Sequence, residues 1–387
     1  MERIYLDNAA TAFPKAAGVP EAMYHYLTSC GCNVNRGGYA EAYQTEETLL
    51  ATRQQLTDLF HGFGCRNVVF TKNITESLNF ILKGLLKPGD HVLVSAMEHN
   101  AMMRPLTQLS KNGVTFTRIP CHADGTLMFE QMEALLQPNT RAVAMLHASN
   151  VCGTLMPVGE IGAFCRKHGL VFILDTAQTA GTFPIDMQAM QIDALAFTGH
   201  KGLLGPQGIG GFLLRPELVS KIEPLLSGGT GSISHTEEIP TFMPDRFEAG
   251  TMNLPGIIGL HAALCALEKT GIDPIRTHEL ALTDQFLQGL RAIDGLRIVG
   301  REDVTNRAAV VSVVPEFADP AFVADALERE FGIMTRVGLH CAPNAHKVLG
   351  TFPTGTIRFS FGAHNTAQHV QTALDALDKL SHRTDWS

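Results

Sequence analysis

Short apolar runs that alternate with helical segments are the feature that most constrains the fold of this 387-residue chain. Each run is rich in β-branched or other apolar residues and is followed directly by polar ones. The runs occupy residues 67–70, 91–95, 141–146, 170–174, 194–197 and 208–214. Continuous apolar strands separated by helices are typical of a mostly parallel sheet covered on both faces. The sequence therefore predicts an α/β fold with a mostly parallel central sheet.

The pattern changes after about residue 255, where a second and smaller unit is expected. Residues 256–269 predict a helix that is apolar around much of its circumference. Further strands and amphipathic helices follow it, at 296–300, 308–314, 319–332, 355–361 and 367–380. This alternation indicates a smaller α+β domain. We expect a large domain over 15–255 and a small domain formed by 1–14 together with 256–387.

Composition and charge argue against several classes of partner. The formal net charge is −8, and no run of basic residues is interleaved with aromatics, so nucleic acid is not an expected partner. No stretch approaches the roughly 18 apolar residues of a membrane span, and the N-terminus has no apolar signal segment. We therefore expect a cytoplasmic protein that does not bind membranes.

The eight cysteines are scattered through the chain, which favours reduced thiols over a disulfide framework. Cys30 and Cys32 are too close together for the usual zinc spacing, and no second pair of ligands completes a tetrahedral site. No metal site is expected, and the sequence assigns no role to these two cysteines.

Polar side chains follow the apolar runs at the point where each predicted strand ends. They are His99, Asn150, Asp175, Gln178 and Lys201. Ligands of open parallel sheets bind outside the carboxyl ends of the strands. These side chains therefore predict a single site at one edge of the sheet.

The residue types in this set suit pyridoxal phosphate. That cofactor needs a lysine for a covalent link, a carboxylate facing its ring nitrogen, a flat group on its ring, and N–H and hydroxyl groups around its phosphate. Lys201, Asp175 and His99 can fill the first three roles. The segment 71–77 (TKNITES), together with Thr198, can fill the fourth. The glycines around Lys201 would leave the backbone slim beside a cofactor.

An ordered series of motifs along essentially the whole chain resembles the NifS-like cysteine desulfurases and selenocysteine lyases, which are class V pyridoxal-phosphate enzymes of fold type I. The motifs are YLDNAAT, NVNRGGY, FTKNITESLN, MEHNA, SNVCGT, DTAQTAG, FTGHKGLLGPQGIGG, RFEAGTMN, TRVGLHCAP and IRFSF. Several of them are specific to this family rather than to pyridoxal-phosphate enzymes at large. The short segment 336–343 (RVGLHCAP) most resembles the SufS-like, group II branch.

The resemblance implies a role for each residue of the predicted cofactor site. Lys201 would carry the covalent link, Asp175 would pair with the pyridine nitrogen, and His99 would stack on the ring. Asn150 and Gln178 would address the phenolic oxygen. The residues that hold the phosphate would be Thr75, Thr198, His200 and Thr251, the last reaching in from the second subunit of a homodimer.

The resemblance also implies how a substrate is bound and attacked. Cys341 matches the persulfide-forming cysteine, and sulfur abstraction needs a thiolate, so the neighbouring His340 and Arg336 favour this role. Arg358 matches the arginine that binds the substrate carboxylate, for which a planar guanidinium is well shaped. Asn35 is a further expected substrate-binding residue.

The expected activity is that of a homodimeric cysteine desulfurase. It would convert L-cysteine to L-alanine, with Lys201 and His99 moving protons and Cys341 taking the sulfur as a persulfide for an acceptor protein. A selenocysteine lyase is the nearest alternative. An aminotransferase or β-lyase with an incidental cysteine is more distant. A non-catalytic pyridoxal-phosphate regulator would be expected to lack the lysine or the carboxylate, and this chain has both.

Overall fold

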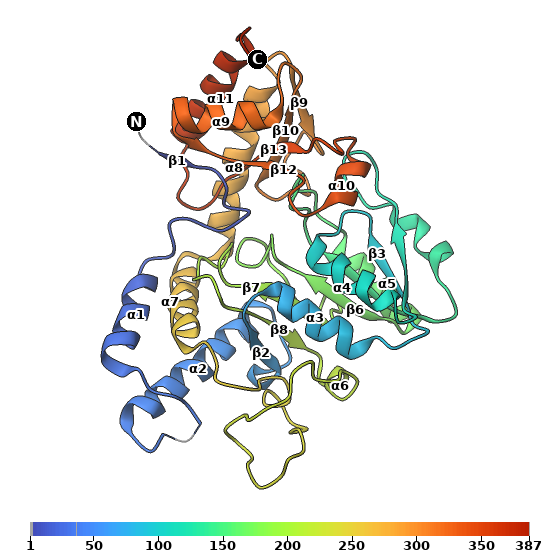
Figure 1. Cartoon of the computed structure of the whole chain (residues 1–387), viewed down its shortest axis with the longest axis vertical. Helices are drawn as coiled ribbons and strands as arrows, with labels where there is room; N and C mark the ends of the chain where they lie inside the picture. Colours follow the sequence, from blue (N-terminus) through green and yellow to red (C-terminus); the bar gives the residue numbers. More distant parts are fainter. Residues whose placement is uncertain (1–2, 36, 387) are drawn as a thin grey trace.

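The structure, a computed structural model, describes residues 3–35 and 37–386 (Figure 1). Within these residues a seven-stranded sheet has the order β2-β8-β7-β6-β5-β3-β4. Its strands are β2 (Val68–Thr71), β3 (His91–Ser95), β4 (Thr115–Ile119), β5 (Thr140–Leu146), β6 (Val171–Asp175), β7 (Ala194–Thr198) and β8 (Gly210–Leu214). β7, β6, β5, β3 and β4 are parallel neighbours, and β8 runs antiparallel to β7 and β2. The predicted mostly parallel sheet is confirmed.

Helices cover both faces of this sheet because the apolar strand residues alternate between the two faces. One face packs on α3 (Ile74–Leu85) and α4 (Asn100–Ser110). The other face packs on α2 (Ala40–Leu59), α5 (Val158–His168) and α7 (Leu254–Thr270). Strand β4 differs from the predicted strands because its first four residues are not buried. It lies at the edge of the sheet and carries a weaker apolar signal.

A smaller antiparallel sheet forms a second centre of packing, which lies above the large sheet in Figure 1. Its described strands, in spatial order, are β12 (Arg336–Gly338), β13 (Thr356–Ser360), β10 (Val310–Pro315) and β9 (Leu296–Val299). It shares an apolar core with α8 (Ile272–Leu290), α9 (Pro320–Phe331) and α11 (Ala367–Ser381). The other short helices are α1 (Val19–His25), a π-helical turn (Tyr26–Cys30), α6 (Pro216–Val219) and α10 (Pro343–Val348), with 3₁₀ turns at Cys65–Asn67, Phe129–Gln131 and Glu133–Leu135.

The N-terminal segment lies beside this smaller sheet. Strand β1 (Ile4–Tyr5) pairs in parallel with β11 (Ile333–Met334), and Asp7 forms an isolated bridge with Ser360. The division of the chain at 14/15 and 255/256 stays a prediction. In the described parts of the chain, no helix combines the length and the apolar character needed to span a bilayer.

Candidate active site

Asp175 and Lys201 lie at the same edge of the large sheet. Asp175 is the last residue of β6 and is 4% exposed, while Lys201 follows the end of β7 by three residues. Because β6 and β7 are parallel neighbours, their carboxyl ends meet at one edge. The structure therefore brings together the two residues that sequence reasoning placed at the centre of the site.

Burial shifts the pKa values of Asp175 and Lys201. It raises the pKa of Asp175, against the opposing effects of the Ala177 N–H, which donates to Oδ1 at 2.8 Å, and of the Lys201 charge. Burial also lowers the pKa of Lys201 to about 8; Asp175 opposes this shift, while the charges of Arg358 and Arg336 add to it. An amine whose pKa lies close to neutrality can take up and release a proton under physiological conditions.

His99 is held in one tautomer by the helix that it caps. It precedes α4, and its Nδ1 accepts a hydrogen bond from the backbone N–H of Ala101 at 2.9 Å. Burial, reinforced by the charge of Lys201, lowers the pKa of His99 to about 4. The ring is therefore neutral at pH 7, and its proton lies on Nε2. This geometry favours a proton-donor role for His99 over a proton-acceptor role.

Four residues of the predicted site have buried polar atoms with no hydrogen-bond partner among the described residues. The atoms are Asn150 Oδ1, Thr198 Oγ1, His200 Nδ1 and Arg358 Nε. Unsatisfied buried polar groups are costly and call for an explanation. Their concentration at the edge that holds Asp175 and Lys201 fits a polar ligand with several oxygen atoms. The residues present therefore fit pyridoxal phosphate.

Cys341 opens into a cavity that His99 and Thr75 also line. The cavity has a volume of about 230 Å³, and Arg104 and Asn100 contribute to its wall. Cys341 is exposed. The structure thus places the candidate nucleophile beside the candidate proton donor and one candidate phosphate ligand.

The backbone around Cys341 is fixed by a tight turn. His340 and Cys341 both have left-handed backbone conformations, with φ of 46° and 58°. The carbonyl of His340 accepts a hydrogen bond from Asn150 Nδ2 at 2.7 Å, and the carbonyl of Cys341 accepts one from Asn100 N at 2.8 Å. A loop and the first residue of α4, both of which follow strands of the large sheet, therefore position a turn that follows a strand of the small sheet.

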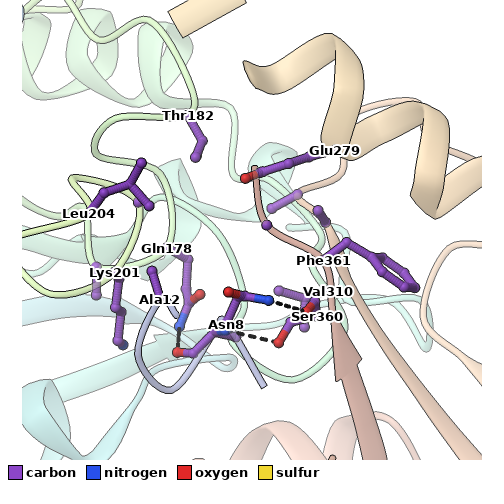
Figure 2. A pocket seen from close by; sticks show the side chains of 16 residues that line it. Asn8, Ala12, Gln178, Thr182, Lys201, Leu204, Glu279, Val310, Ser360 and Phe361 are labelled. Carbon is purple, nitrogen blue, oxygen red and sulfur yellow. Dashed lines mark hydrogen bonds between the residues drawn. The ribbon is translucent and has the colours of Figure 1, made fainter. Parts of the chain in front are cut away.

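A second, smaller cavity lies on the Lys201 side of the site (Figure 2). Its volume is about 40 Å³, and Lys201, Gln178 and Asn8 are among the residues that line it. The amide of Gln178 donates from Nε2 to the carbonyl of Ala9 at 3.1 Å. The N-terminal segment therefore forms one wall of the site and fixes a residue predicted to contact the cofactor.

Arg358 lies in β13 and is 2% exposed. Its Nη1 donates to the carbonyl of Asn150 at 3.0 Å, and its Nη2 lies 2.8 Å from Asp7 Oδ1. Sequence reasoning missed Asp7, although the YLDNAAT motif that contains it was a signal. Asp7 is consequently a newly identified member of the site.

His340 and Arg336, the two residues expected to favour the role of Cys341, have other partners. The His340 ring is buried and bonds through Nε2 to Thr356 Oγ1 at 2.9 Å. Burial, with a further contribution from Arg358, lowers the pKa of His340 to about 2, so its ring is neutral. Arg336 Nη1 lies 3.7 Å from Asp7 Oδ2. His340 therefore supplies no positive charge for a thiolate.

Thr251 and Asn35 do not line the cavities that contain Lys201 or Cys341. Thr251 is exposed and lines a cavity of about 350 Å³ with Lys72 and Glu76. Asn35 lines another, of about 270 Å³, and its Nδ2 donates to the carbonyl of Thr230 at 2.8 Å. Their predicted roles stay predictions, and that of Thr251 requires a second copy of the chain.

The cysteines away from the site are free thiols, as is Cys341. Cys32 Sγ lies 3.0 Å from Thr45 Oγ1, and Cys30 Sγ lies 3.9 Å from His25 Nε2. Across residues 3–35 and 37–386, no three His, Cys, Asp or Glu side chains are grouped so that they could hold a metal ion.

The low pKa of Lys201 predicts an unusual reactivity in the cofactor-free protein. A lysine reacts with acylating reagents as the free amine, so the labelling of Lys201 should rise through a midpoint near pH 8, where its pKa of about 8 places half of the amine in the free form. Mass spectrometry of the labelled peptides across a pH series measures this midpoint, with the exposed Lys72 as the internal reference. A labelling curve for Lys201 that coincides with that of Lys72 would show that burial has no such effect.

Comparisons with known proteins show which family the chain is similar to. Residues 4–373 match the family described as aminotransferase class-V. A probable cysteine desulfurase from Methanothermobacter thermautotrophicus is 32% identical over 384 residues, which cover 98% of this chain and 95% of that protein. A probable cysteine desulfurase from Pyrococcus abyssi is 35% identical over 387 residues, which cover 98% and 94% of the two chains.

Solved structures of cysteine desulfurases are also similar to this chain. The apo structure of the cysteine desulfurase from Thermococcus onnurineus has a TM-score of 0.92 and 33% identity, covering 98% of this chain and 94% of that one. The cysteine desulfurase CsdA from Escherichia coli has a TM-score of 0.87 and 31% identity, covering 97% and 94%. The resemblance inferred from the motifs is confirmed. The chain belongs to the aminotransferase class-V family, and its relatives in that family are cysteine desulfurases.

Proposed function

We propose that this protein is a homodimeric, pyridoxal-phosphate-dependent cysteine desulfurase that converts L-cysteine to L-alanine and takes the sulfur on Cys341. Two relatives named as probable cysteine desulfurases, which are 32% and 35% identical to this chain over nearly its whole length, support this activity. The observation that carries the proposal is the cavity shared by Cys341 and His99, next to the edge that holds Lys201 and Asp175. An exposed thiol there is well placed to meet a substrate and, later, an acceptor protein.

Pyridoxal phosphate, when bound, supplies an electron sink that stabilises negative charge on the substrate carbon. Lys201 would hold the cofactor covalently, and Asp175 would face its ring nitrogen. His99 would lie against the ring, with Gln178 and Asn150 at the phenolic oxygen. The phosphate would be held by Thr75, Thr198, His200 and Thr251 of the second subunit.

The remaining steps belong to the side chains of the protein. Arg358 would bind the substrate carboxylate, for which its buried Nε is an available donor. Lys201, whose pKa of about 8 leaves part of it as free amine, would accept the Cα proton. Cys341 thiolate would then attack the substrate sulfur. As the S–S bond forms and the C–S bond breaks, the electron pair stays on the substrate carbon, which takes a proton to give alanine.

One comparison of substrates tests this proposal. The protein loaded with cofactor is incubated separately with L-cysteine and L-selenocysteine, and alanine, pyruvate, sulfide and selenide are measured. A desulfurase produces alanine from L-cysteine. Formation of alanine from L-selenocysteine but not from L-cysteine would instead identify a selenocysteine lyase. Formation of pyruvate and sulfide from L-cysteine would identify a β-lyase.

A homodimer is supported by the surface near Thr251 and Asn35. Large apolar side chains are exposed on the N-terminal helices and on the extended segment 224–250, among them Tyr24, Leu27, Tyr43, Leu50, Leu226 and Phe242. Of these, Leu50 lines the cavity of Asn35 and Leu226 lines that of Thr251, and exposed apolar side chains of this size are common at protein interfaces. A second copy would bury this surface and bring Thr251 towards the phosphate.

The dimer should therefore be required for cofactor retention. We expect an interface of roughly 2,000 Å² or more, and we expect cofactor to be lost on dilution as the dimer dissociates. Thr251→Ala should weaken retention of the phosphate, whereas Thr270→Ala, at the exposed end of α7, should not. Sedimentation together with cofactor absorbance measures both quantities. A monomer that keeps its cofactor at low concentration would contradict this assignment.

A further inference from the structure

We propose that Asp7 is a specificity-determining residue, which neutralises one of two arginines so that the site favours amino acids with a single carboxylate. This inference rests on the proposed function, because it assumes that Arg358 binds the carboxylate of an amino acid.

The geometry places Asp7 between two guanidinium groups. Its Oδ1 lies 2.8 Å from Nη2 of Arg358, and its Oδ2 lies 3.7 Å from Nη1 of Arg336. The side chain of Arg358 is 3% exposed, that of Asp7 16% and that of Arg336 47%. One carboxylate therefore bridges a buried arginine and a more accessible one.

The backbone holds Asp7 in this bridging position. Its carbonyl accepts hydrogen bonds from the Tyr5 hydroxyl at 3.1 Å and from Ala10 N at 3.0 Å. Asp7 also forms a parallel bridge with Ser360, two residues beyond Arg358 in β13. Because the segment is fixed at these points, the Asp7 carboxylate is held beside the guanidinium of Arg358, which is expected to bind the substrate carboxylate.

The net charge of this cluster can balance one anionic group. Arg358 and Arg336 contribute two positive charges, and Asp7 removes one. The polar neighbour of Arg358 on its other side is neutral, since Nη1 donates to the carbonyl of Asn150. A single substrate carboxylate would balance the remaining positive charge. A second carboxylate would add negative charge next to Asp7, which costs binding energy at a partly buried site.

The pKa of Lys201 depends on the charges of Arg358, Arg336 and Asp7, which supports their placement at the site. Arg358 and Arg336 lower the pKa of Lys201, and Asp7 raises it. The three charges therefore lie close enough to Lys201 to affect its protonation.

Replacing Asp7 with asparagine should relax this selectivity, because Arg358 and Arg336 would both lose their anionic partner and could together balance two carboxylates. We expect Asp7→Asn to raise the affinity for L-aspartate relative to that for L-alanine by about tenfold. The dissociation constants of both amino acids are measured on the cofactor-loaded enzyme from the change in cofactor absorbance, and independently from thermal shifts. The ratio of the two dissociation constants is the decisive quantity, because a merely structural role of Asp7 would weaken both affinities together.

Three further variants complete the test. Asp7→Glu keeps the charge and should keep a ratio close to that of the wild type. Asp124→Asn, whose carboxylate lies 3.7 Å from Arg301, is the matched control and should leave the ratio unchanged. Arg336→Gln removes the second positive charge, so it should shift the ratio in the opposite direction, towards L-alanine. This variant also decides the matter if Asp7→Asn does not fold.

The outcomes separate this inference from the proposed function. A wild-type protein that binds L-alanine, together with unchanged ratios in Asp7→Asn and Arg336→Gln, would overturn the role of Asp7 alone. A wild-type protein that, with cofactor bound, binds neither amino acid would overturn the proposed function itself. Opposite shifts in the two variants are the result that supports the inference.

Discussion

Replacing Cys341 with alanine should abolish the formation of alanine from L-cysteine while the fold and the cofactor colour remain. The Cys341 side chain is exposed, and the cysteine is held through its backbone carbonyl, so little packing is lost. Sulfur abstraction, by contrast, would lose its nucleophile. We expect the rate to fall by at least about 10³-fold, a modest figure beside the losses seen when catalytic nucleophiles are removed. Alanine formation is the measurement, with cofactor absorbance as the check on the fold.

The control for this variant is Cys30→Ala, which removes a partly exposed thiol elsewhere and should keep full activity. Turnover of selenocysteine is expected to survive in part in Cys341→Ala, because selenium is the better leaving atom. Desulfuration of cysteine at the wild-type rate would make Cys341 a bystander and favour the β-lyase alternative.

The second large effect is expected from Lys201→Ala. This variant should lose the covalent link to the cofactor, and with it the yellow colour and all turnover, since no other amine takes the place of Lys201 in the proposed reaction. Some cofactor should remain bound through its phosphate. Borohydride reduction followed by peptide mapping measures the position of the link in the wild type.

Lys15 makes this mapping a stringent test. Its Nζ lies 3.1 Å from the carbonyl oxygen of His200, the residue before Lys201, and burial lowers the pKa of Lys15 to about 8 as well. Lys15 is thus a second amine of similar basicity beside the site. A reduced adduct on Lys15, or on any lysine other than Lys201, would show that the site has been assigned wrongly.

The central sheet could be predicted from the sequence because most of its strands are buried on both faces. The apolar run at 91–95, for example, coincides with β3, and each of the other predicted runs overlaps a strand. The strand β4 was missed, since its residues at the sheet edge are largely solvated and leave no continuous apolar run. Burial on both faces produces the signal, and an edge strand lacks it.

The site could be predicted only where its residues follow strands of the large sheet or belong to a motif. Asp175 and Lys201 follow neighbouring strands, so topology brings them together. The contact between Asp7 and Arg358 joins residues 351 positions apart in different elements, and no local pattern reveals it. The same holds for His340, whose bond to Thr356 makes it a buried structural residue rather than a source of positive charge.

The most direct test of the central claim follows the sulfur atom itself. The cofactor-loaded wild-type protein is mixed with a limiting amount of L-cysteine, without reductant or acceptor. Alanine is then quantified, and the cysteine-containing peptides are examined by mass spectrometry. We predict that alanine and a single added sulfur on the Cys341 peptide appear in equal amounts. Alanine without sulfur on Cys341, or sulfur on a different cysteine, would contradict the account.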